Sequence, residues 1–139
     1  MQAESVVYGC IKDSVYEHEV SHRAKANRDA LLELPSADSW PLLSREMFAA
    51  TDHATDIDIH TEVVHFGASY RGIEYEWQVW IEQFEALLRK MYWVTVTVHL
   101  ETEMSGTHSF VWETNHAYHE PGRSDMKLRC EWLHDAGLD

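Results

Sequence analysis

The clearest hydrophobic pattern in the chain lies between Glu74 and Met91. Apolar side chains recur there with the 3.6-residue period of an α-helix, so one side of the helix is apolar. Polar side chains occupy the opposite side, and acidic residues in the first turn suit the helix dipole. The pattern predicts one long amphipathic helix with the buried stripe Trp77, Trp80, Ile81, Phe84, Leu87, Leu88 and Met91.

After residue 92 the hydrophobic period changes to two, which is typical of a half-buried β-strand. Two such strands, 93–101 and 107–113, are joined by a turn at Ser105-Gly106. A loop of three residues ending at Gly106 sets Leu100 opposite Phe110, and so gathers the apolar residues on one face. We predict this register, which pairs Glu103 with Thr107 and Val98 with Trp112 and gives Gly106 a left-handed conformation.

The remaining segments predict further elements before and after this region. The patterns indicate a strand over 5–11, a helix over 16–34, a strand over 57–70 and a last strand over 126–132. Asp13-Ser14 is a candidate cap for the first helix, and Pro35 ends it. In the strand over 57–70 the alternation changes phase, which predicts a bulge near Val63-Val64.

The predicted order of elements is β-α-β-α-β-β-β over one domain, residues 1–139. This order predicts an α/β chain of the α+β type, a two-layer sandwich. Two helices are expected on one face of a mixed or antiparallel sheet.

The composition is acidic, with 24 Asp and Glu against 11 Lys and Arg and a formal charge of −13. A field of this sign repels nucleic acid and anionic lipid and attracts basic partners. No apolar run approaches the roughly 20 residues of a membrane helix, and the amino terminus does not resemble a signal peptide. Two cysteines, Cys10 and Cys130, are too few for a disulfide framework. We therefore expect a cytoplasmic protein with reduced thiols and no cofactor.

One short motif offers an alternative function. His18-Glu19-Val20-Ser21-His22 matches H-E-x-x-H, the zinc-binding pattern of metallopeptidases. The resemblance implies His18 and His22 as metal ligands and Glu19 as the base that activates water. On the predicted helix, however, both histidines fall almost opposite the apolar stripe, where they face solvent. The candidates for a third ligand are His116, His119 and Glu120.

The outer face of the predicted hairpin needs a different explanation, because it carries polar and acidic side chains around Trp93. An exposed tryptophan among carboxylates is a common form of a protein-binding hot spot. We therefore predict a partner-binding surface on this hairpin face, with an acidic segment as a second patch. The predicted contact residues are Trp93, His99, Glu101, Glu103 and Glu113 on the hairpin, and Asp52, Asp56 and Asp58 in the second patch.

Small size, acidity, many aromatic residues and the lack of catalytic motifs resemble the immunity proteins encoded beside bacterial polymorphic and secreted toxins. The resemblance implies a protein that is not an enzyme and that occludes the basic active site of a toxin domain. Charge complementarity would speed the encounter, and a few aromatic contacts would slow release. The alternatives are the zinc-dependent hydrolase and a homodimeric interaction domain whose exposed sheet face binds a second copy.

Overall fold

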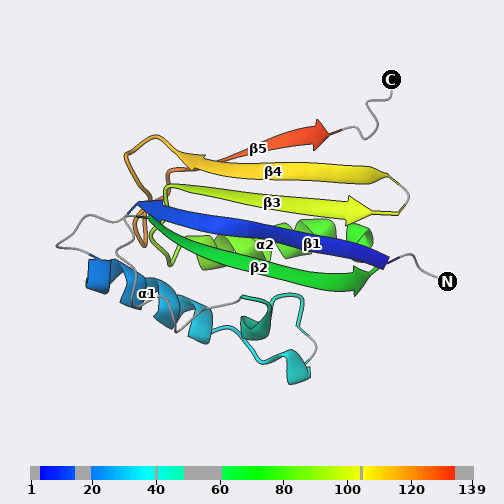
Figure 1. Cartoon of the computed structure of the whole chain (residues 1–139), viewed down its shortest axis with the longest axis horizontal. Helices are drawn as coiled ribbons and strands as arrows, with labels where there is room; N and C mark the ends of the chain where they lie inside the picture. Colours follow the sequence, from blue (N-terminus) through cyan, green and yellow to red (C-terminus); the bar gives the residue numbers. More distant parts are fainter. Residues whose placement is uncertain (1–3, 15–19, 40, 49–60, 104, 134–139) are drawn as a thin grey trace.

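A five-stranded antiparallel sheet forms the centre of the computed structural model, which describes residues 4–14, 20–39, 41–48, 61–103 and 105–133 (Figure 1). The strand order is β2-β1-β3-β4-β5, and every neighbouring pair is antiparallel. The elements are β1 (Glu4–Ser14), α1 (Val20–Leu32), η2 (Ala37–Ser39), η3 (Arg45–Met47), β2 (Thr61–Arg71), η5 (Ile73–Glu76), α2 (Trp77–Leu88), β3 (Thr95–Thr102), β4 (Gly106–Thr114) and β5 (Met126–Leu133). The predicted α+β class and element order are confirmed.

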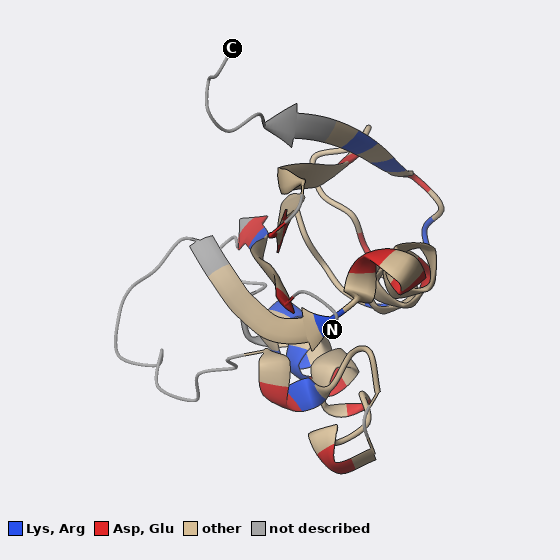
Figure 2. Cartoon of the chain, turned by 90° about the vertical axis from the view of Figure 1, so that its right-hand side faces the viewer, with Lys and Arg blue, Asp and Glu red and all other residues tan. Residues whose placement is uncertain are grey.

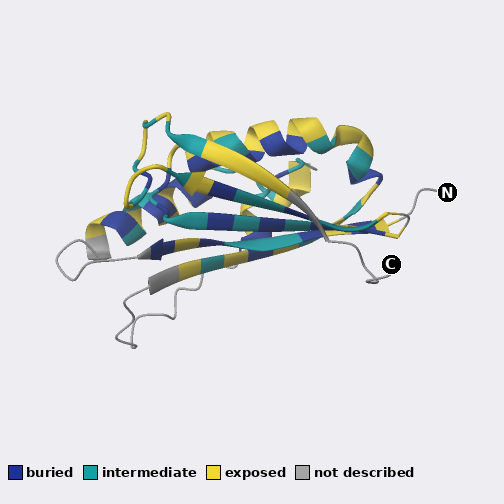
Figure 3. Cartoon of the chain, turned by 90° about the horizontal axis from the view of Figure 1, so that it is seen from above, coloured by how far each residue is buried: buried dark blue, intermediate teal, exposed yellow. Residues whose placement is uncertain are grey.

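Helix α2 crosses one face of the sheet, and its buried side is the stripe predicted from the sequence (Figure 3). Phe84 is fully buried at the centre of this contact, where its ring meets those of Phe66 at 5.3 Å and Trp112 at 5.2 Å. Trp80 stacks on the same ring at 4.9 Å. Burying each large side chain contributes roughly 1.5–3 kcal/mol, so this aromatic cluster is a main source of the sheet–helix packing.

In the hairpin of β3 and β4 the predicted apolar residues share one face, but they pair in a different register. Val98 lies opposite Phe110, and Thr102 opposite Gly106 is the last pair before the turn, so the predicted pairing is wrong by two residues. Alternation in a strand determines only which residues share a face, and both registers satisfy it. Local bonding selects the observed one, because the Thr102 Oγ1 accepts a hydrogen bond from the Ser105 N–H at 2.8 Å. Gly106 has a positive φ of 78°, as predicted.

Two other details of the predicted strands are wrong. The β1–β2 ladder is continuous from Thr61 to Arg71, so there is no bulge at Val63-Val64. Strand β1 extends to Ser14, which places Asp13 inside the sheet rather than at a helix cap. Asp13 is 2% exposed there, because it has a buried ionic partner.

That partner is Arg23 of α1, a residue whose charge indicates a solvated position but whose exposed fraction is 0%. Its Nε and Nη2 donate to the two carboxylate oxygens of Asp13, the first at 3.0 Å. The guanidinium carbon lies 4.0 Å from the ring centre of Tyr118 and 5.0 Å from that of Tyr92. A planar cation with bidentate bonding and aromatic neighbours is the form in which a charge is best accommodated inside a protein. The ion pair therefore joins α1 to the sheet and to the two loops that carry Tyr92 and Tyr118.

Removing this cation should be strongly destabilising. Arg23→Met leaves the buried Asp13 carboxylate without its guanidinium, and we expect a loss of roughly 3–5 kcal/mol in the free energy of unfolding. Lys25→Met on the same helix is the matched control. It removes an exposed pair with Asp29 and should cost less than about 1 kcal/mol. Urea unfolding followed by tryptophan fluorescence measures both, and equal losses would contradict the structural role of Arg23.

Candidate protein-binding surface

The face of the sheet opposite α2, here called the outer face, carries a row of polar side chains from neighbouring strands. Tyr8, His99 and Ser109 are consecutive cross-strand neighbours in β1, β3 and β4. The Tyr8 ring lies 5.0 Å from the His99 ring, and His99 Nδ1 is 2.8 Å from Ser109 Oγ. The Tyr8 hydroxyl donates to Glu101 Oε2 at 2.7 Å. These contacts hold the side chains of the predicted residues His99 and Glu101 in defined positions.

The bond to Glu101 changes the acidity of Tyr8. The Glu101 carboxylate accepts a hydrogen bond from the phenol, and its negative charge opposes formation of a phenolate beside it. Together with partial burial, this raises the pKa of Tyr8 above its ordinary value of 10.0. The folded chain therefore holds this proton more tightly than the unfolded chain does. The resulting contribution to stability is complete below pH 10 or so and is lost as the pH rises through the raised pKa.

Acidic residues gather at one end of the sheet, which Figure 2 shows end-on. The β3–β4 turn, the start of β1 and the η5 segment meet there, and their contacts are direct. The Glu4 N–H donates to Glu103 Oε1 at 3.2 Å, and the Ser5 hydroxyl donates to Glu74 Oε1 at 2.9 Å. Arg71, across from Glu4 in the β1–β2 ladder, adds a basic residue. We call this region the acidic end and define it by Glu4, Glu74, Glu76, Glu101 and Glu103.

An exposed aromatic side chain stands within the acidic end. Tyr75 lies between Glu74 and Glu76 in η5 and is 82% exposed, the highest value among the exposed large hydrophobic residues. Val79, one turn further along, is 44% exposed. The sequence contained a signal for this position. At about 100° per residue, Tyr75 falls opposite Phe84 and the rest of the buried stripe. The sequence reasoning missed it because it followed the buried side of the helix.

The predicted hot spot Trp93 is wrong, because this residue is fully buried. Its indole N–H donates to the Leu88 carbonyl at 3.0 Å, and its ring stacks on His119 at 4.8 Å. Trp93 precedes the first residue of β3 and forms an isolated bridge with His119. The inside–outside alternation that placed it on the outer face applies only within the strand.

The other predicted contact residues do not form one surface. Glu101 and Glu103 belong to the acidic end, and His99 lies in the middle of the outer face. Glu113 lies near the opposite end of β4, where Arg129 donates to its carboxylate at 3.3 Å and Lys127 is its cross-strand neighbour. Its charge is therefore largely balanced. Asp52, Asp56 and Asp58 lie outside the described residues.

The residues of the alternative zinc site are only partly described. His18 and Glu19 lie outside the described residues, whereas His22 is exposed, with its Nε2 3.1 Å from the Tyr92 hydroxyl. His119 is unsuited to a third-ligand role. It is fully buried, with Nδ1 2.9 Å from the Met91 carbonyl oxygen and Nε2 3.0 Å from that of Arg123. Among the described residues, no three His, Cys, Asp or Glu side chains are grouped as a metal site requires.

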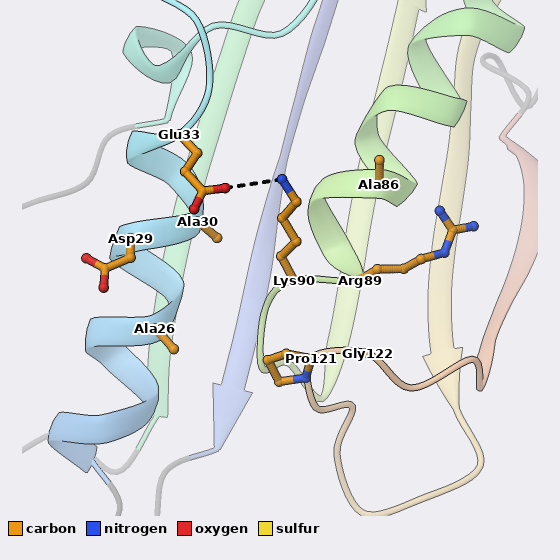
Figure 4. A pocket seen from close by; sticks show the side chains of 9 residues that line it. All are labelled: Ala26, Asp29, Ala30, Glu33, Ala86, Arg89, Lys90, Pro121 and Gly122. Atoms are coloured by element: carbon orange, nitrogen blue, oxygen red, sulfur yellow. Dashed lines mark hydrogen bonds and ion pairs between the residues drawn. The ribbon is translucent and has the colours of Figure 1, made fainter.

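A groove of about 630 Å³ lies between α1 and α2 (Figure 4). Lys90 and Glu33 form an ion pair of 3.2 Å across it. Alanines from both helices line the groove, and charged residues surround them. The lining residues are Ala26, Asp29, Ala30, Glu33, Ala86, Arg89, Lys90, Pro121 and Gly122. Asp29 is also in an ion pair, with Lys25, so three of the four charged lining residues already have a charged partner.

Comparison with protein-family models, with curated proteins and with solved structures gives no match for this chain. Across the described residues, no helix has both the length and the apolar character needed to span a membrane.

The Tyr8–Glu101 bond predicts the titration of Tyr8. Glu101→Gln removes the negative charge and should lower the pKa of Tyr8 toward its ordinary value. Carbon-13 NMR of labelled tyrosine, with Tyr8→Phe used for assignment, measures this pKa directly. Glu113→Gln, on the same face and at the far end of β4, should leave it unchanged. An unchanged pKa in Glu101→Gln would show that the two side chains are not bonded in solution.

Proposed function

We propose that this chain is a binding protein for a basic protein surface and that the acidic end is where the partner docks. The observation that carries the proposal is Tyr75, an aromatic side chain that is 82% exposed between two glutamates. A partner that covers a ring of this size gains apolar packing against it and a hydrogen bond to its hydroxyl. Tyrosine is accordingly among the residue types enriched at binding hot spots.

Carboxylates at the same end of the molecule give this surface its selectivity. Glu101 and Glu103 lie at the same end of the molecule as Glu74, which the bond to Ser5 connects to the sheet. Charges at the rim of an interface act mainly on the rate of encounter and on the choice of partner. The net charge of −13 adds a long-range attraction for a positively charged protein. The basic active site of a nuclease or of a nucleotide-handling enzyme would match this surface in charge.

The class of partner follows from the resemblance to immunity proteins. A toxin domain that acts on nucleic acid or nucleotides needs a basic active site, and an acidic protein seated over it would exclude its substrate. We therefore propose an immunity protein that neutralises a toxin by occlusion. Occlusion requires a rigid surface and no catalytic group. The hydrogen bonds that hold Glu101, Glu103 and Glu74 support such a rigid surface.

The proposal predicts that the neighbouring gene encodes a toxin-like domain, and binding of this chain to that domain tests it. Co-expression should rescue growth, and Tyr75→Ala should raise the Kd of the purified complex by roughly 30-fold, the effect of losing one hot spot. Paired Glu101→Gln and Glu103→Gln changes should slow association, most strongly at low salt, because steering is screened by ions.

Two control variants make this test specific. Leu32→Ala removes a side chain that is 55% exposed on α1, and Asp29→Asn removes one exposed charge on the same helix. Both should leave the Kd and the association rate unchanged. Tight binding that is indifferent to Tyr75 and to the glutamates of the acidic end would reject this surface, and absence of growth rescue would reject the immunity function.

A further inference from the structure

Strand β5 is an unprotected edge of the sheet. It pairs with β4 without interruption from Met126 to Leu133, and within the described part of the chain no strand pairs with its other side (Figure 1). The opposite edge strand, β2, is different. Phe48 forms a bridge to Phe66 there, and the Tyr70 hydroxyl donates to the Leu42 carbonyl at 2.5 Å. A long, regular edge with free backbone groups is a site for pairing with another strand.

The side of β5 that faces the helix layer is also exposed. Helix α2 reaches as far as β4, where Glu85 accepts from the Trp112 indole at 2.8 Å and Trp77 contacts Phe110 at 5.2 Å. The next strand lies beyond this contact. Leu128, across from Trp112 in β5, is therefore 42% exposed, and Cys130 is exposed as well. Figure 3 shows most of the described part of β5 as exposed. Apolar side chains on an unpaired edge favour an occupant that brings apolar side chains of its own.

We propose that a second copy of this chain pairs with β5 in antiparallel fashion about a two-fold axis at Cys130. The charge pattern of the strand selects this register. An axis at Lys127, Arg129 or Glu131 would place each of these charges against itself, and an axis at Leu128 would oppose Lys127 to Arg129 of the second copy. Of the axes at residues 127 to 131, only the one at Cys130 avoids these like-charge pairs, and it sets Arg129 across from position 131, a glutamate.

The same register also matches the two faces of the strand. Residues 128, 130 and 132 alternate with the charged positions, and the axis at Cys130 places Leu128 across from position 132, a tryptophan. Arg129 holds Glu113 and is 51% exposed, so its guanidinium is accessible from solvent. Basic residues on an edge strand discourage pairing with unrelated strands. Here they leave the edge open to a strand with the reciprocal charge pattern, which the second copy supplies.

Cysteine cross-linking tests the register. Paired residues in antiparallel strands have Cα atoms about 4.5–5.5 Å apart, which lies within the range that a disulfide spans. Diamide, which accepts the two electrons and two protons released by a pair of thiols, should therefore link two chains through Cys130. Cys10→Ser should leave the cross-link intact, and Cys130→Ser should abolish it. A cross-link that depends on Cys10, or none at all, would overturn the register.

Charge reversal tests the interface without cysteine chemistry. Light scattering on the full chain should give a concentration-dependent mass that rises toward two copies. Arg129→Glu and Glu131→Arg should each oppose like charges across the axis and raise the dimer dissociation constant roughly tenfold. A mixture of the two variants restores opposite charges at both pairs and should regain the dimer.

A chain that stays monomeric at all concentrations, or a mixture that fails to regain the dimer while each variant keeps its circular dichroism spectrum, would reject the proposal. The outcome is independent of the proposed function, because Tyr75 and the acidic glutamates are not part of β5.

Discussion

The ion pair between Arg23 and Asp13 determines how the first half of the chain is assembled. A buried charge is tolerated only when its partner and its surroundings are held in place. Here β1 supplies the carboxylate, α1 supplies the guanidinium, and Tyr92 and Tyr118 supply aromatic faces. Among the described residues the Arg23 Nη1 finds no hydrogen-bond partner, which adds to the cost of burying the charge. Any displacement of α1 would break the bonds that offset the desolvation of the two charges. The pair therefore specifies the position of the helix more than it adds net stability.

The sequence was sufficient to predict the elements and which side of each is buried, but not which charged residues pair across the fold. Periodicity identified the buried stripe of α2 and the alternation of β3, because these patterns are local. It could not reveal that Arg23 is buried, since that depends on a carboxylate ten residues earlier and on two loops far along the chain. The hairpin register was missed for a related reason. Alternation left two solutions, and a single side-chain bond from Thr102 decided between them.

The candidate surface was predictable only where it depends on local patterns, and not where it depends on contacts between distant segments. Glu101 and Glu103 follow from strand alternation and turn position alone. Their association with Glu4 and Glu74 depends on a ladder between β1 and β3 and on the packing of η5, which are long-range features. Trp93 shows where alternation stops applying, because this residue lies two positions before the first residue of β3. Tyr75 shows the reverse case, in which the helical period marks an exposed aromatic residue once the outer side is considered.

The two proposed surfaces are compatible in geometry. Leu133 pairs with Thr107, and Thr107 pairs with Glu101, so the carboxyl end of β5 points toward the acidic end. Antiparallel pairing about Cys130 turns the second copy around, which places the two acidic ends at opposite ends of a continuous sheet. A parallel arrangement would instead set these carboxylates side by side, where their repulsion would oppose assembly. The charge distribution therefore favours the two-fold dimer, and each copy keeps Tyr75 and its glutamates accessible to a basic partner.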